Sequence, residues 1–249
     1  MALAALVTAL TASSGARAET PPPTGFSSPG YEVPDLSAWT LRAGELELGP
    51  TAVHLGFADV FQVGTRFALN LFGALNADLK WTIHKSDTVA VGVELGVLRF
   101  DPSLVGIDEA FSVWAVPISA RVSGRPSDDF RVHGRVDFLI ARPDSEAPDS
   151  VKRIQRYLGP VGRLAVTLGA EWRANDSLAL VAELESPLIL HRETFRYEGE
   201  DAASDFLRAT LALQVAYSSL SLRVGGGYGP SWLGESGWFP VFEIALRLY

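Results

Sequence analysis

Two kinds of side chain in this sequence could carry chemistry, the histidines and a pair of adjacent carboxylates. His54, His84, His133 and His191 could act as general bases, and Asp128–Asp129 could share a proton as an acidic pair. The acidic pair lies in a predicted turn, where aspartate is common because its side chain bonds to the nearby backbone. Strand parity places His54, His84 and His133 on an inward face, where we expect ordinary hydrogen bonding. The sequence therefore predicts a protein that is not an enzyme.

The elements that must position these side chains are long strands. In the stretch DTVAVGVELGVLRF, which spans Asp87 to Phe100, an aliphatic residue stands at every second position from Val89 to Val97. Small residues and Glu94 stand between them. Successive side chains of a strand point to opposite faces, so one face is aliphatic and the other is small and polar. A strand in a soluble domain has about five or six residues, and this one is about twice as long.

The same two-residue period recurs along most of the chain, and no segment sustains a helical period. Alternating segments cover 75–84, 114–122, 130–140, 163–172, 178–185, 207–217 and 220–228. Short turns and longer loops alternate between them without exception. This pattern predicts an all-β fold, an antiparallel up-and-down transmembrane β-barrel with short periplasmic turns and long outer loops. Strands of about ten residues fit a tilted crossing of the bilayer.

The ends of the chain decide the strand count. Counting back from a last strand at Phe239–Tyr249 gives twelve strands if Ser37–Leu48 and Thr51–Phe57 are the first two. The second of these is short, so a barrel of ten or eleven strands is the alternative. A soluble β-sandwich or lipocalin-like barrel would also alternate, but it would turn its apolar face inward. Trp and Tyr near the strand ends favour the membrane barrel, because aromatic side chains gather at both membrane interfaces.

Composition and the N-terminus limit the partners and the cellular location that we expect for this barrel. The net charge is -8, which argues against a nucleic-acid partner, and there is no cysteine. Residues 1–18 resemble a signal peptide, with an apolar stretch followed by Ala16-Arg17-Ala18, although no basic residue precedes the apolar stretch. Residues 19–36 are rich in proline and predict an extended tether. Residues 37–249 form the predicted barrel, and the expected location is the cell outer membrane.

The inward faces carry charges of both signs. Strand parity places these side chains in the lumen: Arg66, Asp78, Lys80, Glu94, Arg131, Arg135, Asp137, Arg163, Glu171, Glu183, Glu185, Arg208 and Arg223. A channel that selects one sign of ion carries an excess of the opposite sign along its wall. The near balance here predicts ion pairs across a narrow or charge-filled lumen. Inward glycines leave room for these long side chains, and they also allow the alternative of an open channel.

One outer loop carries a basic cluster. Lys152, Arg153 and Arg156 lie within a short span of the loop 142–160. A basic cluster at the outer rim would attract the phosphates of lipopolysaccharide. The alternative is an ordinary solvated loop. Neither a metal site nor a cofactor is expected.

The segment Thr40–Asp87 carries features that are similar to those of known proteins. It has a Gly-Glu strand at Gly44-Glu45, a Gly-x-x-Asp turn at Gly56–Asp59, and an Asn-x-x-x-Lys strand at Asn76–Lys80. These features resemble the opening of a broad group of uncharacterised bacterial outer-membrane β-barrel proteins. The resemblance covers about a fifth of the chain and implies the barrel fold, with no assigned activity.

The C-terminus also resembles that of outer-membrane barrels. Tyr249 is similar to the terminal aromatic residue that the barrel-assembly machinery reads, which implies this machinery as a partner. The usual signal has apolar residues at alternate positions before the aromatic. Here Arg247 and Glu243 stand at those positions, and Phe242 and Leu248 lie on the other face. The register of the last strand is therefore an open question at this point.

Three functions remain on sequence grounds. The first is a non-catalytic barrel with a narrow or charge-filled lumen and a structural or surface-interaction role, in contact with outer-membrane lipid and lipopolysaccharide. The second is a small diffusion channel or substrate-specific porin that passes small solutes. The third is an enzyme that modifies envelope lipids, which would need a histidine within reach of a serine and an acid.

Overall fold

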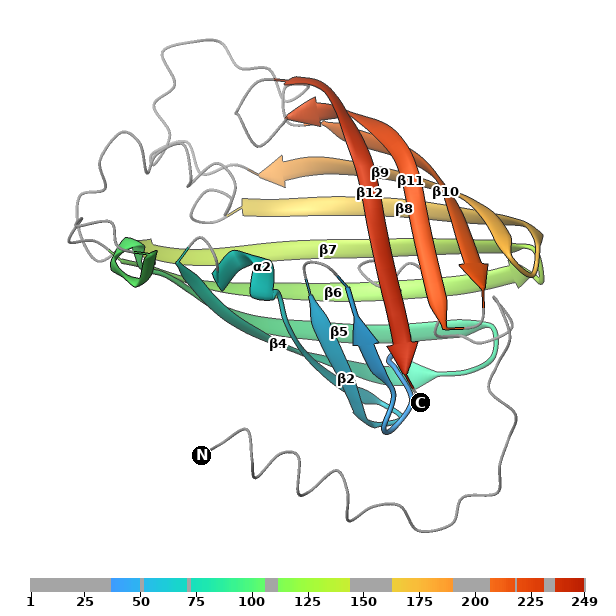
Figure 1. Cartoon of the computed structure of the whole chain (residues 1–249), viewed down its shortest axis with the longest axis horizontal. Helices are drawn as coiled ribbons and strands as arrows, with labels where there is room; N and C mark the ends of the chain where they lie inside the picture. Colours follow the sequence, from blue (N-terminus) through green and yellow to red (C-terminus); the bar gives the residue numbers. More distant parts are fainter. Residues whose placement is uncertain are drawn as a thin grey trace.

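The chain forms a closed antiparallel barrel. The computed structural model describes residues 37–49, 52–70, 73–105, 112–143, 163–189, 207–217, 219–230 and 236–248. Within these residues each strand pairs with its neighbours in the sequence, and the first strand pairs with the last (Figure 1). The predicted signal peptide and tether, residues 1–36, lie outside the described residues.

The strands are of two kinds. Three short strands come first: β1 (Leu46–Leu48), β2 (Val53–Ala58) and β3 (Phe61–Thr65). Nine strands of ten to fifteen residues follow: β4 (Ala74–Lys85), β5 (Val89–Phe100), β6 (Val113–Ser127), β7 (Phe130–Pro143), β8 (Arg163–Asn175), β9 (Leu178–Ile189), β10 (Arg208–Tyr217), β11 (Leu220–Pro230) and β12 (Ser236–Leu248). The prediction of twelve strands is confirmed.

Helical structure is confined to short pieces between strands. The described residues contain the one-turn helix α2 (Phe67–Asn70) and the 3-10 turn η3 (Pro102–Val105). No helix among them is long and apolar enough to cross a membrane. Asp101 begins η3, and its carboxylate accepts hydrogen bonds from the Ser103 hydroxyl and the Ser103 backbone N–H. These bonds, together with nearby Arg99, lower the pKa of Asp101.

The two ends of the barrel differ in their connections. Tight turns after β2, β4, β6, β8 and β10 all lie at one end, which we call the short-turn end (Figure 1). The connections that carry α2 and η3 lie at the other end, the long-loop end. This alternation of short and long connections follows the predicted pattern.

The prediction of one strand over Ser37–Leu48 is wrong. Only Leu46–Leu48 pair as a strand. Ser37–Arg42, which we call the inner segment, leave the wall, and Ser37–Leu41 of this segment are buried inside the barrel. A tight turn separates the two parts, closed by a hydrogen bond from the Glu45 N–H to the Arg42 carbonyl oxygen (3.0 Å). Gly44 has a φ of 86° in this turn, a conformation that glycine adopts without steric cost.

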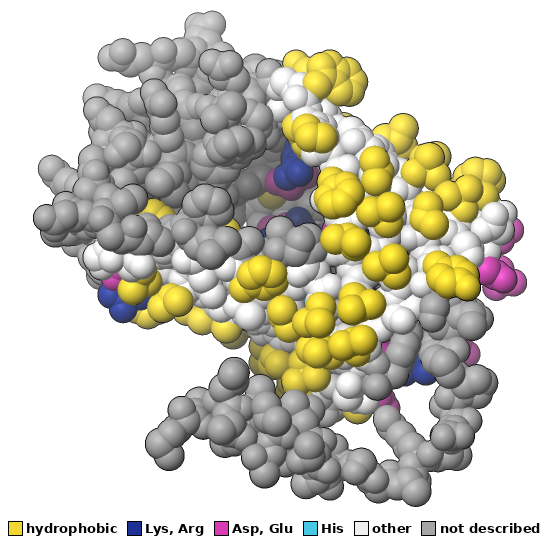
Figure 2. Space-filling model, in the orientation of Figure 1, with side chains coloured by type: hydrophobic (Ala, Val, Ile, Leu, Met, Phe, Trp, Pro, Cys, Tyr) yellow, Lys and Arg dark blue, Asp and Glu magenta, His cyan; other side chains and the backbone are white. Residues whose placement is uncertain are grey.

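Burial is reversed relative to a water-soluble domain. Aliphatic side chains on the outer face are exposed, with Leu211 and Ile83 each 54% exposed. Inward charged side chains are buried, with Lys80 at 2% and Glu171 at 0%. Figure 2 shows apolar side chains spread over the outer face of the strands. The register of β12 follows the same rule, because Phe242 faces outward and Arg247 is buried in the lumen.

Candidate functional site: the occupied lumen

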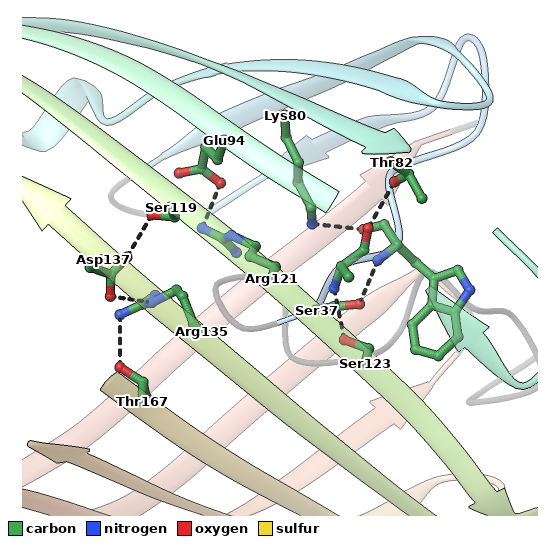
Figure 3. Close-up of polar contacts among 12 residues, drawn as sticks. Ser37, Lys80, Thr82, Glu94, Ser119, Arg121, Ser123, Arg135, Asp137 and Thr167 are labelled. Carbon is green, nitrogen blue, oxygen red and sulfur yellow. Dashed lines mark hydrogen bonds and ion pairs between the residues drawn. The ribbon is translucent and has the colours of Figure 1, made fainter. Parts of the chain in front are cut away.

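The inner segment is held by hydrogen bonds between its backbone and side chains of the barrel wall. The Ala38 N–H donates to Ser123 Oγ (2.8 Å), and Thr82 Oγ1 donates to the Ala38 carbonyl oxygen (2.7 Å). Lys80 Nζ donates to the Trp39 carbonyl oxygen (2.7 Å). Figure 3 shows Lys80, Thr82 and Ser123 converging on this segment from their strands. The polar wall thus satisfies a backbone that has no strand partner.

Further contacts bind the segment to β3, the neighbour of β4 in the wall. The Leu41 N–H donates to Gln62 Oε1 (3.2 Å), and Thr40 Oγ1 donates to the Asp59 carbonyl oxygen (2.9 Å). Gln62 belongs to β3, and Asp59 belongs to the turn before it. The inner segment therefore lies along the inner face of the wall from β6 to β3.

Trp39 anchors the segment at the short-turn end. The indole is 3% exposed and packs with Ala38 and Ala90. Its Nε1–H donates to the Ser86 carbonyl oxygen in the turn between β4 and β5 (3.3 Å). The guanidinium of Arg125 lies 5.3 Å from the ring centroid, a cation–π arrangement. A buried tryptophan with these contacts fixes the segment near the mouth of the barrel.

Gly56 allows the close approach of the inner segment to β2. A Cβ at this position would collide with the carbonyl oxygen of Arg42 and the carbonyl carbon of Leu41. Gly92 plays a similar part on β5, where a Cβ would lie 2.9 Å from the Trp81 carbonyl oxygen and 3.3 Å from that of Ala38. These two glycines make room for a second layer of chain inside the wall.

Buried ion pairs fill the lumen close to the short turns. Glu171 lies between two guanidinium groups, with Arg173 Nε at 2.6 Å and Arg131 Nη1 at 3.7 Å from its Oε1. All three side chains are almost completely buried. Arg247 of β12 pairs with Glu47 of β1 where the barrel closes. Each charge is thus compensated away from solvent, which a buried charge requires.

Other ion pairs of the lumen are more open. Arg223 Nη1 bridges Glu183 (3.3 Å) and Glu243 (3.0 Å), and the two carboxylate side chains are 25% and 33% exposed. Arg135 Nε lies 2.6 Å from Asp137 Oδ2, and both side chains keep some exposure. Figure 3 shows the Arg135–Asp137 pair with its further contacts to Ser119 and Thr167.

The remaining predicted lumen residues lie in varied settings. Glu94 pairs with Arg121 (2.5 Å). Asp78 lies in β4 opposite Gly64 and Gly96, and Glu185 lies opposite Arg208. Arg66 follows the end of β3 and is exposed.

Some predicted residues cannot be placed in this way. Arg163 begins β8, and its side chain is not among those described. Lys152, Arg153 and Arg156 lie outside the described residues, so the lipopolysaccharide contact stays a prediction.

Two of the histidines lie against polar lumen groups. His133 is buried, and its Nδ1 lies 2.8 Å from Ser123 Oγ. Its Nε2 has no hydrogen-bond partner among the described residues, so no carboxylate orients the ring as in a catalytic triad. The same Ser123 hydroxyl accepts the Ala38 N–H and lies beneath the inner segment. His54 Nδ1 lies 3.5 Å from Glu47 Oε1.

His84 is exposed at the end of β4. Ser86 stands two residues after it. The Ser86 hydroxyl is engaged with the backbone of Val89. No group of three or more metal-ligating side chains occurs in the described part of the chain.

Sequence reasoning missed several members of the lumen network. Arg121, Arg173, Glu243, Arg247 and Glu47 all join ion pairs with inward residues. Strand parity could have found Arg121, because it alternates with the outward Ala120 and Val122. The hydrogen-bonding role of Ser37–Leu41 has no such signal, because the segment pairs through its backbone.

Comparisons with known proteins were made on sequence and on structure. No family model matches the sequence, and no curated protein matches it. Among solved structures, the KdgM porin and the NanC porin each align over 82% of this chain at 8% identity with a TM-score of 0.46, covering 97% and 98% of those chains. LpxR from Salmonella typhimurium aligns over 81% of this chain and 88% of its own, at 10% identity and a TM-score of 0.41.

These neighbours are bacterial outer-membrane β-barrels. The likeness is one of barrel architecture only, because the sequence identities are low. In this chain the lumen is occupied at one end by the inner segment.

Proposed function

We propose that this chain is a non-catalytic β-barrel of the bacterial outer membrane whose lumen is closed near the short-turn end. The observation that carries the proposal is the inner segment, which is buried and bonded to β3, β4 and β6 at once. The ion pairs of Glu171 and Glu47 fill the same end. A solute that entered from the long-loop end would meet this layer before it reached the short turns.

The membrane location is supported by the reversed burial of the wall. Exposed aliphatic side chains on the outer face of β4, β5 and β10 would be unfavourable in water over so large a patch. Strands of ten to fifteen residues are long enough to cross the hydrocarbon layer when tilted. The pairing of β1 with β12 closes the sheet, and the paired strands satisfy one another's backbone groups, as a lipid environment demands.

The non-catalytic part of the proposal is supported by the setting of the histidines. Ser123 and His133 are the one described serine–histidine contact. The serine is covered by the inner segment, and Nε2 of the histidine has no described partner. A hydrolase of envelope lipids would need this pair to be open to its substrate.

A second candidate function is a gated channel for small solutes. It is favoured by the fact that the inner segment is joined to the wall by separable hydrogen bonds and one aromatic anchor. Release of the segment would leave a lumen lined by charges of both signs. In this case the arrangement with the inner segment bound to the wall is the resting state.

Planar bilayer recordings on the full-length refolded protein test the proposal. We expect no steady conductance from a preparation whose heat-modifiable migration on gels proves that the barrel is folded. Steady openings that scale with salt concentration would contradict the closed lumen and support a porin. Brief, voltage-dependent openings would support the gated channel.

A further inference from the structure

The wall of the barrel has a notch on its long-loop half. β11 pairs with β12 along Ser236–Leu246, whereas β1 pairs with β12 only at Leu246–Leu248. From Ser236 to Ala245 the other edge of β12 therefore has no strand partner among the described residues. Pro240 lies in this stretch, as expected of an edge strand, because proline cannot donate to a ladder.

The far side of the notch is β4, with Arg66 and α2 lying against its edge. β3 pairs with β4 only from Asp78 to Trp81, so Ala74–Ala77 extend beyond it. The short strands β1–β3 thus complete the wall only at the short-turn half. Figure 2 shows a hollow in the surface, with Lys or Arg and Asp or Glu side chains of the interior visible inside it.

The rim of the notch is apolar on its outer side. On β12, Trp238 is 83% exposed and Phe242 is 66% exposed. On β4, Leu75 is half exposed, and Phe67 of α2 is also exposed. A side opening that joins a polar interior to an apolar exterior fits a molecule that has both characters.

Arg208 supplies the matching group inside the notch. Its guanidinium lies 4.7 Å from the ring centroid of Phe239, which projects from β12 into the lumen across Gly227 of β11. The Arg208 side chain is exposed and makes no ion pair with any described carboxylate, although Glu185 lies opposite it in the register. An exposed guanidinium held over an aromatic ring is well placed to bind an anion.

We propose that the notch between β12 and β4 admits an acyl-chain amphiphile with an anionic head group. The head binds Arg208 inside the lumen, and the acyl chains lie outside against Trp238 and Phe242. The closed short-turn end makes the chamber one-sided, so the amphiphile enters and leaves through the notch or the long-loop end. The binding is non-covalent and does not depend on whether the inner segment can be released.

An amphiphile fits the notch better than a second copy of this chain. Two β12 edges paired across a dimer axis would satisfy the free backbone groups. Such pairing would place the bulky Trp238 and Phe242 of both copies along one seam, and it would leave Arg208 without a counter-charge. An anionic head group supplies that counter-charge directly.

Site-specific quenching tests the proposal, and the absence of native cysteine makes the labels unambiguous. Single variants Val241→Cys, Phe242→Cys and Thr167→Cys would carry a fluorescent label in vesicles of phospholipid brominated on the acyl chains. Val241 faces inward beside the notch, Phe242 faces outward, and Thr167 is buried in the lumen on β8. We expect labels at 241 and 242 to be quenched and the label at 167 to stay bright.

The head-group part is tested separately by native mass spectrometry of the full chain in a neutral detergent. Wild type should retain dioleoyl phosphatidylglycerol or oleate over phosphatidylcholine, and Arg208→Gln should weaken the anionic complex about tenfold, the effect of losing one charge-assisted contact. If the protein retains both anionic lipids, the site binds anionic head groups in general. If it retains phosphatidylglycerol alone, the site binds a phosphate head group.

Three results would overturn the inference. One is a label at 241 that is quenched no more than the label at 167. A second is a dimer with an unquenched label at 241, which would assign the β12 edge to a second copy. The third is equal retention of anionic and zwitterionic lipid in wild type and Arg208→Gln. If the wild-type barrel conducts, the proposal of a closed lumen is wrong. The quenching and the lipid-retention results would still test the notch.

Discussion

Glu171 and Glu243 both face the lumen and both pair with arginine, but their surroundings differ. Glu171, near the short-turn end of β8, is completely buried between Arg131 and Arg173. Glu243, near the middle of β12, shares Arg223 with Glu183 and keeps a third of its side chain exposed. The surroundings of Glu171 resemble a protein core built from charged residues, and those of Glu243 resemble the wall of a chamber.

The cause of the difference is the first part of the chain. The inner segment adds a layer of backbone inside the short-turn half, and β1–β3 close the wall only at that height. The long-loop half has neither. In the proposed account, one short stretch of sequence therefore both closes one end of the barrel and leaves the other end open at the side.

Removal of the two carboxylates should give the strongest contrast. Glu171→Gln removes a buried carboxylate that lies between two buried guanidinium groups, so we expect the free energy of unfolding to fall by about 3–5 kcal/mol. Glu243→Gln should cost about 0–1 kcal/mol, because its pair is partly solvated. Urea unfolding in lipid vesicles, followed by heat-modifiable migration, measures both. Equal losses would show that the two sites do not differ in this way.

Displacement of the inner segment should change conductance. Gly56→Ala places a methyl group against the carbonyl of Arg42, so the segment must shift and openings should appear in planar bilayers. Gly226→Ala is the matched control on β11, where the nearest heavy atom to a new Cβ is 3.8 Å away. The account of the short-turn half fails if folded Gly56→Ala is as silent as the control.

Charge removal at the long-loop end should weaken contact with lipopolysaccharide. Replacement of Lys152, Arg153 and Arg156 by Gln should reduce co-purification, with each basic residue near an anionic membrane surface worth about 1 kcal/mol. Lys85→Gln is the control, because Lys85 is an exposed basic residue next to a short turn. Unchanged co-purification of the triple variant would remove the proposed contact.

Loss of a single hydrogen bond should give the smallest effect. Thr82→Val removes the bond to the Ala38 carbonyl, and we expect a loss of about 0.5–1.5 kcal/mol in the free energy of unfolding. Thr210→Val changes the same side chain at an inward position of the long-loop half and should stay within about 0.5 kcal/mol of wild type. Similar losses in both variants would mean that the inner segment adds no stability.

The barrel could be predicted from the sequence because a strand between lipid and lumen imposes a strict two-residue period. That period predicts the twelve strands. It also predicts that Glu94 and Lys80 point into the lumen. It could not reveal the inner segment, because Ser37–Leu41 mix small, polar and apolar residues and are held through their backbone. The prediction of a full first strand therefore failed at the place where the chain leaves the wall.

The lumen network was only partly predictable for a related reason. Parity assigns a side chain to a face but gives no height along the barrel and no partner across it. The contact of Ser123 with His133 and the closure of the barrel by Arg247 and Glu47 depend on the stagger between strands, which only the folded register provides.

A cross-link between the inner segment and the wall tests the central claim most directly. The Ala38 N–H lies 2.8 Å from Ser123 Oγ, so Ala38→Cys with Ser123→Cys should bring two thiols within reach of a disulfide. In the membrane-assembled barrel, mild oxidation should join them and block thiol labelling, whereas Ala38→Cys with Thr210→Cys should stay reduced. If the 38–123 pair remains as open to labelling as the 38–210 pair, the inner segment does not occupy the lumen.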